Sequence, residues 1–190
     1  MLQTLNTSAL IKTTSVDIPA DDLQLAKDIA DIWFAKDERT KKFHPSVMSV
    51  LDIPELSTYR GVFMTCAAEY MLAYSGNCKI EIVESWLTKS VDQSKFEYHE
   101  LHTHPADLTI VMHLTTGGGD LKLLSPVNSS PHIEEFNYFN QHREVFSIEP
   151  VEGKITIFPS HMEHCVDNEA KSEPRYSLAC DFRITEEGGL

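Results

Sequence analysis

Cysteine is scarce in this sequence, and no two cysteines stand at close spacing. The four present in 190 residues are Cys66, Cys78, Cys165 and Cys180, and no CxxC pair occurs. This scatter excludes a disulfide framework and a zinc knuckle. It favours a reducing compartment, so we expect a cytoplasmic protein in which most of these thiols are buried.

Long apolar runs and an excess of positive charge are missing as well. No window approaches the roughly 18 apolar residues of a membrane span, and the N-terminus lacks the pattern of a secretion signal. Sixteen Lys and Arg stand against 29 Asp and Glu, which gives a formal net charge of −13. We therefore expect no membrane segment and no non-specific binding to nucleic acid.

The chain does have the composition of a globular domain, with 42% hydrophobic and 24% charged residues. Apolar residues recur at helical spacing in residues 17–42 and again in residues 55–77, where a Ser-Gly-Asn stop signal ends the pattern. These two segments predict an N-terminal helical support.

After residue 77 the pattern changes to the alternation of half-buried strands. Short apolar segments follow one another, separated by Gly, Pro, Asn and Ser, whereas Ser125 to His142 has no clear period and is expected to cap a site. Two helices followed by about eight short strands predict an α+β chain whose body is a β-sandwich or barrel. We expect one domain over residues 1–190, with helical support at 17–77 and a strand core at 78–185.

His102 and His104 are separated by one threonine and followed directly by a proline. Residues two apart in a strand project to the same face, so these imidazoles suit two ligands of one metal ion. A third candidate, His164, opens a predicted strand after a Phe-Pro-Ser turn. Three neutral imidazoles favour Fe(II), Zn(II), Ni(II) or Cu(II) over Mg(II). The remaining histidines of polar segments are interpreted as surface residues: His44, His99, His132 and His142.

Arg175 stands at the head of the last apolar strand, and Ser177 falls on the same face. A buried guanidinium needs a carboxylate partner. That partner is either Asp181, in a structural ion pair, or the carboxylate of a bound acid, and the sequence leaves both open.

These motifs together resemble the 2-oxoglutarate and Fe(II)-dependent oxygenases. The resemblance rests on His-x-His-Pro at 102–105, "EGKITIFPSHMEHCV" at 152–166 and "RYSLACDF" at 175–182, and it covers roughly residues 79–182. It is strongest with small members found in phages and marine bacteria. It implies a double-stranded β-helix, a jelly-roll or cupin-like barrel, behind N-terminal helices. The implied enzyme uses Fe(II), 2-oxoglutarate and dioxygen to hydroxylate a substrate, with release of succinate and CO2.

The resemblance also implies roles for individual residues. His102 and His164 match the two metal-binding histidines of the family. Arg175 and Ser177 match the pair that holds the distal carboxylate of 2-oxoglutarate. In the wider superfamily a carboxylate stands two residues after the first histidine, and here that place is taken by His104.

Two departures from the family pattern leave alternatives open. Asp107, three residues after His104, is the alternative third ligand, although it would have to turn back past Pro105. His113 stands where the family has a tyrosine, so it either binds the cosubstrate or is a plain strand residue. Trp86 and Phe158 either line the pocket or pack in the core.

Residues 153–168 also resemble the second motif of the cupins. Three-histidine cupins include dioxygenases that do not use 2-oxoglutarate, and a cupin-like barrel without metal would be a binding protein. Arg175 separates these alternatives, because only the oxygenase needs it for a cosubstrate. The substrate and the formation of a homodimer are left open by the sequence.

Overall fold

The computed structural model describes residues 3–6, 11–36, 49–74, 78–90, 101–125, 145–166 and 174–186. The elements in chain order are β1 (Gln3–Asn6), β2 (Ile11–Ser15), α1 (Ala20–Lys36), the 3-10 helices η2 (Val50–Asp52) and η3 (Pro54–Leu56), α2 (Ser57–Tyr74), β3 (Cys78–Ser90), β4 (Leu108–His113), β5 (Leu121–Leu124), β6 (Val145–Ile148), β7 (Lys154–Pro159), β8 (His164–Val166) and β9 (Arg175–Glu186).

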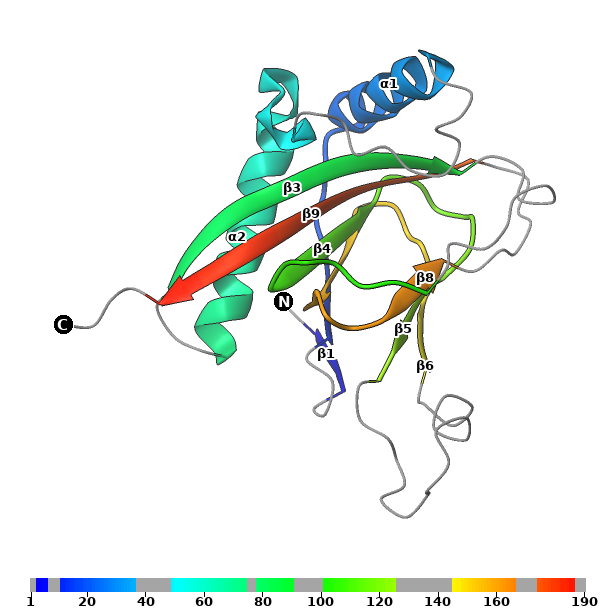
Figure 1. Cartoon of the computed structure of the whole chain (residues 1–190). Helices are drawn as coiled ribbons and strands as arrows, with labels where there is room; N and C mark the ends of the chain where they lie inside the picture. Colours follow the sequence, from blue (N-terminus) through cyan, green and yellow to red (C-terminus); the bar gives the residue numbers. More distant parts are fainter. Residues whose placement is uncertain are drawn as a thin grey trace.

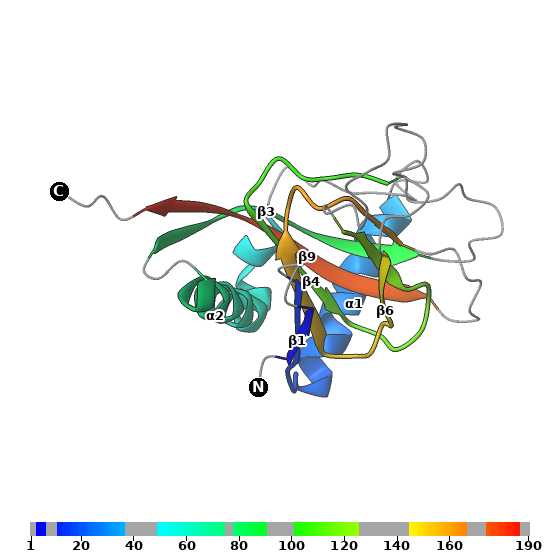
Figure 2. The same cartoon turned by 90° about the horizontal axis from the view of Figure 1, so that it is seen from below.

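The strands form two antiparallel sheets. One has six strands in the order β1-β2-β7-β4-β9-β3, and the other has three in the order β6-β5-β8. Figure 1 shows β3 and β9 as two long strands side by side, with β5, β6 and β8 gathered apart from them. The helices pack on one face of the larger sheet and the smaller sheet packs on the other. In Figure 1 the long strands β3 and β9 run between α1 and the smaller sheet, and Figure 2 shows the same elements from below. The predicted α+β architecture, with N-terminal helices and a body of two sheets, is confirmed.

The face of the larger sheet that carries the helices is a hydrophobic core. α1 begins with Asp21 and Asp22 in its first turn, where carboxylates favour the positive end of the helix dipole. α2 buries Tyr59 and Phe63 among alternate residues of the central strands, which include Ile110 of β4. Apolar spacing therefore predicted both helical segments, and the described helices lie within the predicted ranges 17–42 and 55–77.

The opposite face of the larger sheet packs against the smaller sheet. Every residue of β4 is buried, because this strand is covered on both sides. Val111 of β4 and Ala179 of β9 belong to a second apolar cluster together with Leu121 and Leu123 of β5. The functional side chains lie on this side, between the two sheets.

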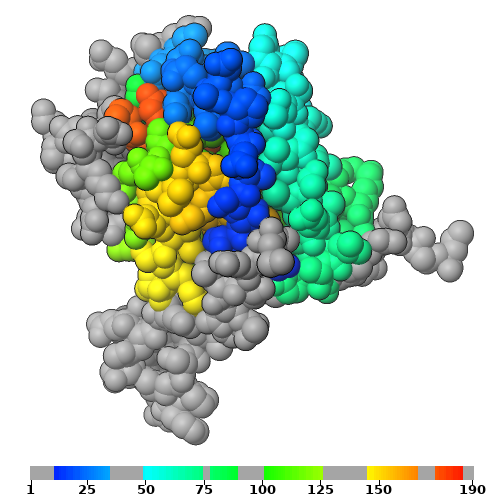
Figure 3. All heavy atoms as spheres, turned by 180° about the vertical axis from the view of Figure 1, so that it is seen from behind, coloured from blue at the N-terminus to red at the C-terminus, as the bar shows by residue number. Residues whose placement is uncertain are grey.

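Strands β1 and β2 were not predicted. Lys12 of β2 pairs with Ile157 of β7, so the N-terminal segment extends the larger sheet by two strands. Seen from behind, the blue N-terminal segment runs down between the yellow strands and α2 (Figure 3). The sequence Ile-Lys-Thr-Thr-Ser lacks the alternation of apolar and polar residues that predicts a strand. β2 joins the sheet through main-chain hydrogen bonds, which leave no pattern in the side chains.

The cysteines and helices agree in part with the expectations from composition. All four cysteines are free, but only Cys66 and Cys180 are buried, while Cys78 and Cys165 are partly exposed. Burial raises the pKa of the Cys66 thiol to about 11. No helix in the described part of the chain has the length and apolar character needed to cross a membrane.

Candidate active site

Three histidines from two distant parts of the chain meet between the sheets. His102 and His164 exchange backbone hydrogen bonds of 3.1 and 3.0 Å, and His104 donates its backbone N–H to the carbonyl of Ser160 at 3.0 Å. One candidate ligand atom of each histidine lies within 4.8 Å of the other two. The sequence predicted this cluster, although only His102 is in an isolated bridge and His104 lies outside any strand, before β4.

The hydrogen bonds of two rings determine which nitrogen faces the site. His164 Nδ1 lies 3.0 Å from the carbonyl of Met162, and His104 Nδ1 lies 2.9 Å from Asp181 Oδ2. A carbonyl and an ionised carboxylate only accept hydrogen bonds, so both Nδ1 atoms carry the hydrogen. The Nε2 atoms of neutral rings are then lone-pair donors, and they face each other at 3.2 Å.

Two lone pairs at this distance repel unless a cation lies between them. Metal–nitrogen bonds to histidine are about 2.1 Å, so nitrogens on neighbouring corners of one ion lie about 3 Å apart. The separation of His104 Nε2 and His164 Nε2 is close to that value. The donor set therefore fits a bound transition-metal ion, and imidazole is a ligand that Fe(II) accepts.

Aromatic side chains fix the planes of these rings. The Trp86 ring stacks on His104, with centroids 5.1 Å apart and an angle of 11° between the planes. Phe158 meets His164 edge-on at 4.9 Å. Trp86 lines the pocket, whereas Phe158 is fully buried in the core. Trp86 therefore both lines the pocket and packs in the apolar cluster between the sheets, and Phe158 packs in that cluster without lining the pocket.

The histidines form one side of a pocket that also contains Arg175 and Ser177. Its walls are otherwise largely apolar, and its lining consists of Trp86, Thr88, His102, His104, Thr109, Val111, Leu121, His164, Val166, Arg175, Ser177 and Ala179. The Arg175 side chain is buried, and its Nε has no hydrogen-bond partner among the described residues. Burial lowers the pKa of Arg175 to about 10, which leaves it charged at neutral pH. A buried, incompletely paired guanidinium in a pocket fits the carboxylate of a bound acid.

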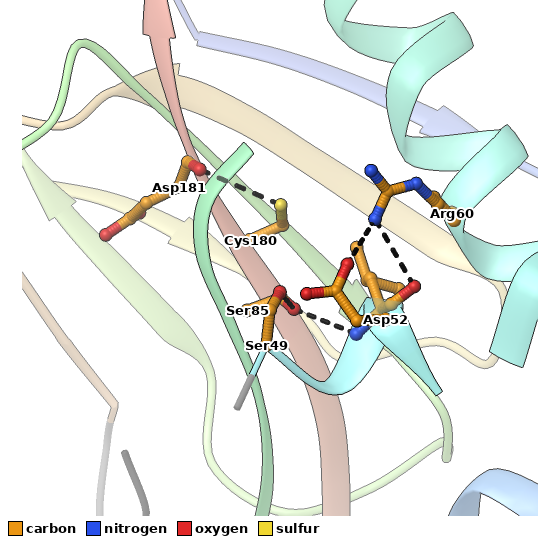
Figure 4. Close-up of polar contacts among 7 residues, drawn as sticks. Ser49, Asp52, Arg60, Ser85, Cys180 and Asp181 are labelled. Carbon is orange, nitrogen blue, oxygen red and sulfur yellow. Dashed lines mark hydrogen bonds and ion pairs between the residues drawn. The ribbon is translucent and has the colours of Figure 1, made fainter. Parts of the chain in front are cut away.

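Asp181 is not the partner of Arg175, which corrects one of the two alternatives left open by the sequence. Its carboxylate binds His104 through Oδ2 and Thr109 through Oδ1. Residues six apart on one strand are about 20 Å apart, because a strand rises about 3.3 Å per residue. Figure 4 shows Asp181 and Cys180 on opposite sides of β9, with Cys180 on the side of Arg60 and Asp52.

A row of polar side chains crosses the sheet next to Arg175. Ser177 pairs across the backbone with Thr88 of β3 on one side and His113 of β4 on the other. The hydroxyls of Thr88 and Ser177 are hydrogen-bonded to each other. Thr88 was missed from the sequence, because its position beside Ser177 depends on the register of β3 and β9.

His113 is fully buried, and neither of its ring nitrogens has a hydrogen-bond partner among the described residues. Burial, then the charges of Arg175 and Lys154, lower the pKa of His113 to about 3. The ring is therefore neutral at physiological pH and keeps both a donor and an acceptor. His113 is not among the residues that line the pocket, although it pairs with Ser177, so its role in binding the cosubstrate stays a prediction.

Asp107, the alternative metal ligand, points elsewhere. Its Oδ2 accepts a hydrogen bond from the backbone N–H of Ile184 at 2.8 Å, and it is not one of the three clustered residues. His44, His99, His132 and His142 lie outside the described residues. So does the expected cap after Ser125, which is itself buried.

A comparison with protein families gives the chain its assignment. Residues 84–181, slightly more than half of the chain, match the family described as "Putative 2OG-Fe(II) oxygenase". The chain belongs to this family. The 2OG-Fe(II) oxygenases are oxidoreductases that depend on Fe(II) and 2-oxoglutarate, so the family assignment confirms the predicted enzyme class and both cofactors. No curated protein sequence matches the chain.

Solved structures confirm the double-stranded β-helix. EctD from S. alaskensis in its apoform is 14% identical with a TM-score of 0.66, over 93% of this chain and 73% of that chain. AviO1 from Streptomyces viridochromogenes Tue57 is 12% identical with a TM-score of 0.64, over 96% and 92%. A Pseudomonas putida prolyl-4-hydroxylase is 15% identical with a TM-score of 0.59, over 93% and 89%. At these low sequence identities, the likeness shows that this chain shares its fold with these proteins.

Proposed function

We propose that this 2OG-Fe(II) oxygenase hydroxylates its substrate at an iron ion held by His102, His104 and His164. In this proposal Arg175 binds the distal carboxylate of 2-oxoglutarate, with help from Ser177 and His113. The observation that carries it is the common pocket, in which two imidazole Nε2 atoms face each other at 3.2 Å and a buried guanidinium completes the lining. A three-histidine cupin has no need of this arginine.

In this proposal the pocket residues and His113, which pairs with Ser177, have separate roles. When bound, Fe(II) supplies, with dioxygen, the oxidising chemistry that converts 2-oxoglutarate to succinate and CO2. Arg175 pairs with the cosubstrate carboxylate in a buried setting, where charge-assisted hydrogen bonds are strong. The Ser177 hydroxyl and the neutral His113 ring add hydrogen bonds to the same group. Apolar residues such as Val111 and Val166 exclude water from the reacting atoms.

The cosubstrate assignment is tested by anaerobic titration of the Fe(II)-loaded protein with 2-oxoglutarate. A weak visible charge-transfer band should appear for the wild type and be lost in Arg175→Ala. Arg183→Ala is the matched control, because Arg183 is an exposed arginine of the same strand. The absence of a band, together with an unchanged melting temperature on adding 2-oxoglutarate, would contradict the proposal.

The choice of the third ligand is tested separately. His104→Ala should weaken Fe(II) binding more than Asp107→Ala, because only His104 presents a ring nitrogen to His164. Isothermal titration under anaerobic conditions measures both affinities. The reverse order of the two losses would make Asp107 the ligand.

Several finer expectations belong to this proposal. They are a cytoplasmic location, a single domain over residues 1–190, membership of the phage and marine bacterial branch, and the formation of a homodimer. The net charge of −13 argues against nucleic acid as a non-specific partner. Size-exclusion chromatography with light scattering measures the oligomeric state.

A further inference from the structure

A buried carboxylate lies directly behind His104. Asp181 in β9 is 3% exposed, and its Oδ2 accepts the hydrogen of His104 Nδ1 at 2.9 Å. Its Oδ1 accepts the hydroxyl hydrogen of Thr109 at 2.7 Å, and Thr109 Oγ1 lies 2.8 Å from Ser160 Oγ. Since Thr109 has a single hydrogen and gives it to the carboxylate, Ser160 must donate to Thr109. The chain of hydrogen bonds therefore has a fixed direction, from Ser160 to Asp181.

We propose that Asp181 is a positioning residue that fixes His104 as an iron ligand and supplies the negative charge that three neutral histidines lack. This inference rests on the proposed function. In the two-histidine, one-carboxylate site the anionic group binds the metal itself. Here the carboxylate is one side chain further out, and the imidazole of His104 lies between it and the metal position.

The contact has two physical consequences. Because Asp181 holds the hydrogen on Nδ1, the tautomer of His104 is fixed and its Nε2 lone pair faces His164. Because the ionised carboxylate polarises the N–H bond, the imidazole becomes a stronger donor to a cation. Asp181, Thr109 and Ser160 come from β9, β4 and the turn after β7, so three separate segments set the orientation of one ring.

A purely structural role would not require a carboxylate. Asparagine fills the same volume and can accept the hydrogen of Thr109, yet a buried charge is costly unless it is paired. Among the described residues, His104 is the only basic side chain that pairs with Asp181. The negative charge is therefore directed at this one imidazole.

The test compares Asp181→Asn with Asp120→Asn by anaerobic isothermal titration with Fe(II). Asp120 makes a matched control, because its carboxylate also accepts a hydroxyl hydrogen, from Ser147 at 2.7 Å, but lies outside the pocket lining. Asp181→Asn should weaken Fe(II) binding by about 10- to 100-fold, the usual cost of losing such a partner. Asp120→Asn should change it by less than about twofold, since exposed charges are screened.

A double-mutant cycle separates positioning from a general structural effect. In a His104→Ala background, Asp181→Asn should cause no further loss of Fe(II) affinity, because the carboxylate acts through that ring. Asp181→Glu, which keeps the charge, should bind Fe(II) more tightly than Asp181→Asn. An equal loss in both backgrounds, or no rescue by glutamate, would overturn the inference.

The outcomes also distinguish the inference from the proposed function. A wild type that binds no Fe(II) would overturn both. A wild type that binds Fe(II) and 2-oxoglutarate, with an Asp181→Asn variant of equal affinity, would overturn the inference alone. If Asp181→Asn does not fold, Thr109→Val tests the same contact, because it removes the donor that orients the carboxylate. A several-fold weaker Fe(II) affinity would then support the inference, and an unchanged affinity would overturn it.

Discussion

At the scale of single residues, the site depends on side chains whose surroundings leave little freedom. Arg175 is an example, because it packs directly against the backbone of Gly118. Gly118 has a φ of +84°, and a Cβ built there would lie 2.5 Å from the Arg175 Cβ. The glycine therefore makes room for the arginine at the position where the cosubstrate carboxylate is proposed to bind.

Gly118→Ala should displace Arg175 and weaken 2-oxoglutarate binding by about tenfold or more, since misplacing one charged contact costs more than about 1.4 kcal/mol. Gly117→Ala is the control, because Gly117 also has a positive φ, +112°, but its Cβ would meet nothing within 4 Å. Titration calorimetry of the Fe(II)-loaded variants measures the affinities. Equal losses in the two variants would show that backbone strain, not contact with Arg175, is responsible.

A second residue-scale prediction concerns the effect of His113 on the stability of the protein at acidic pH. The pKa of His113 is about 3 in the folded protein against an ordinary value of 6.5. Between these values the unfolded chain binds a proton that the folded chain does not, so stability falls as the pH drops below about 6.5. The slope from this residue approaches about 1.4 kcal/mol per pH unit.

His113→Phe should remove this contribution and make the free energy of unfolding less dependent on pH between 6.5 and 4. Urea denaturation at several pH values measures the difference from the wild type. His161→Gln, at an exposed position, should keep the wild-type slope. A His113→Phe variant with an unchanged slope would contradict the low pKa.

At the scale of elements, the approach of β2 and β4 to β7 depends on the turn at Gly153. Gly153 has a φ of +76°, donates its N–H to the carbonyl of His113 and accepts a hydrogen bond from Val16 N–H. A Cβ built there would collide with the carbonyl oxygen of Val16. Three strands are therefore joined at a position that only glycine fits without strain.

Gly153→Ala should lower the free energy of unfolding by about 1–3 kcal/mol, the usual cost of a strained backbone position. Gly61→Ala should instead raise it by about 0.5–1 kcal/mol, because Gly61 is an exposed residue of α2 and its Cβ would meet nothing within 4 Å. Chemical denaturation measures both. A Gly153→Ala variant as stable as the wild type would contradict the account of this turn.

The elements also show what a sequence can reveal of a fold. Alternation and helical spacing are local, and they predicted α1, α2 and β3 to β9. Strand β2 has no such pattern, because it joins the sheet through main-chain hydrogen bonds to β7. Pairing register is equally hidden. For this reason Thr88 was missed, and the sequence left Asp181 open as a partner of Arg175 without indicating its contact with His104.

At the scale of the whole molecule, one face of the larger sheet forms the main core and the other face forms the pocket. The helices cover one face and complete a large apolar core, while the smaller sheet closes over the other face and encloses the pocket. The three site histidines could be proposed from the sequence because His102 and His104 stand two residues apart and His164 follows the more specific Phe-Pro-Ser turn. The residues behind them, Asp181 and Thr109, were not, because they meet His104 only after both sheets have formed.

The most direct test of the central claim is a crystal structure of the protein with Fe(II) and 2-oxoglutarate, prepared without oxygen. We predict one iron ion bound by nitrogens of His102, His104 and His164, with the distal carboxylate of 2-oxoglutarate on Arg175. Iron bound by Asp107 in place of His104, or 2-oxoglutarate bound away from Arg175, would contradict the account.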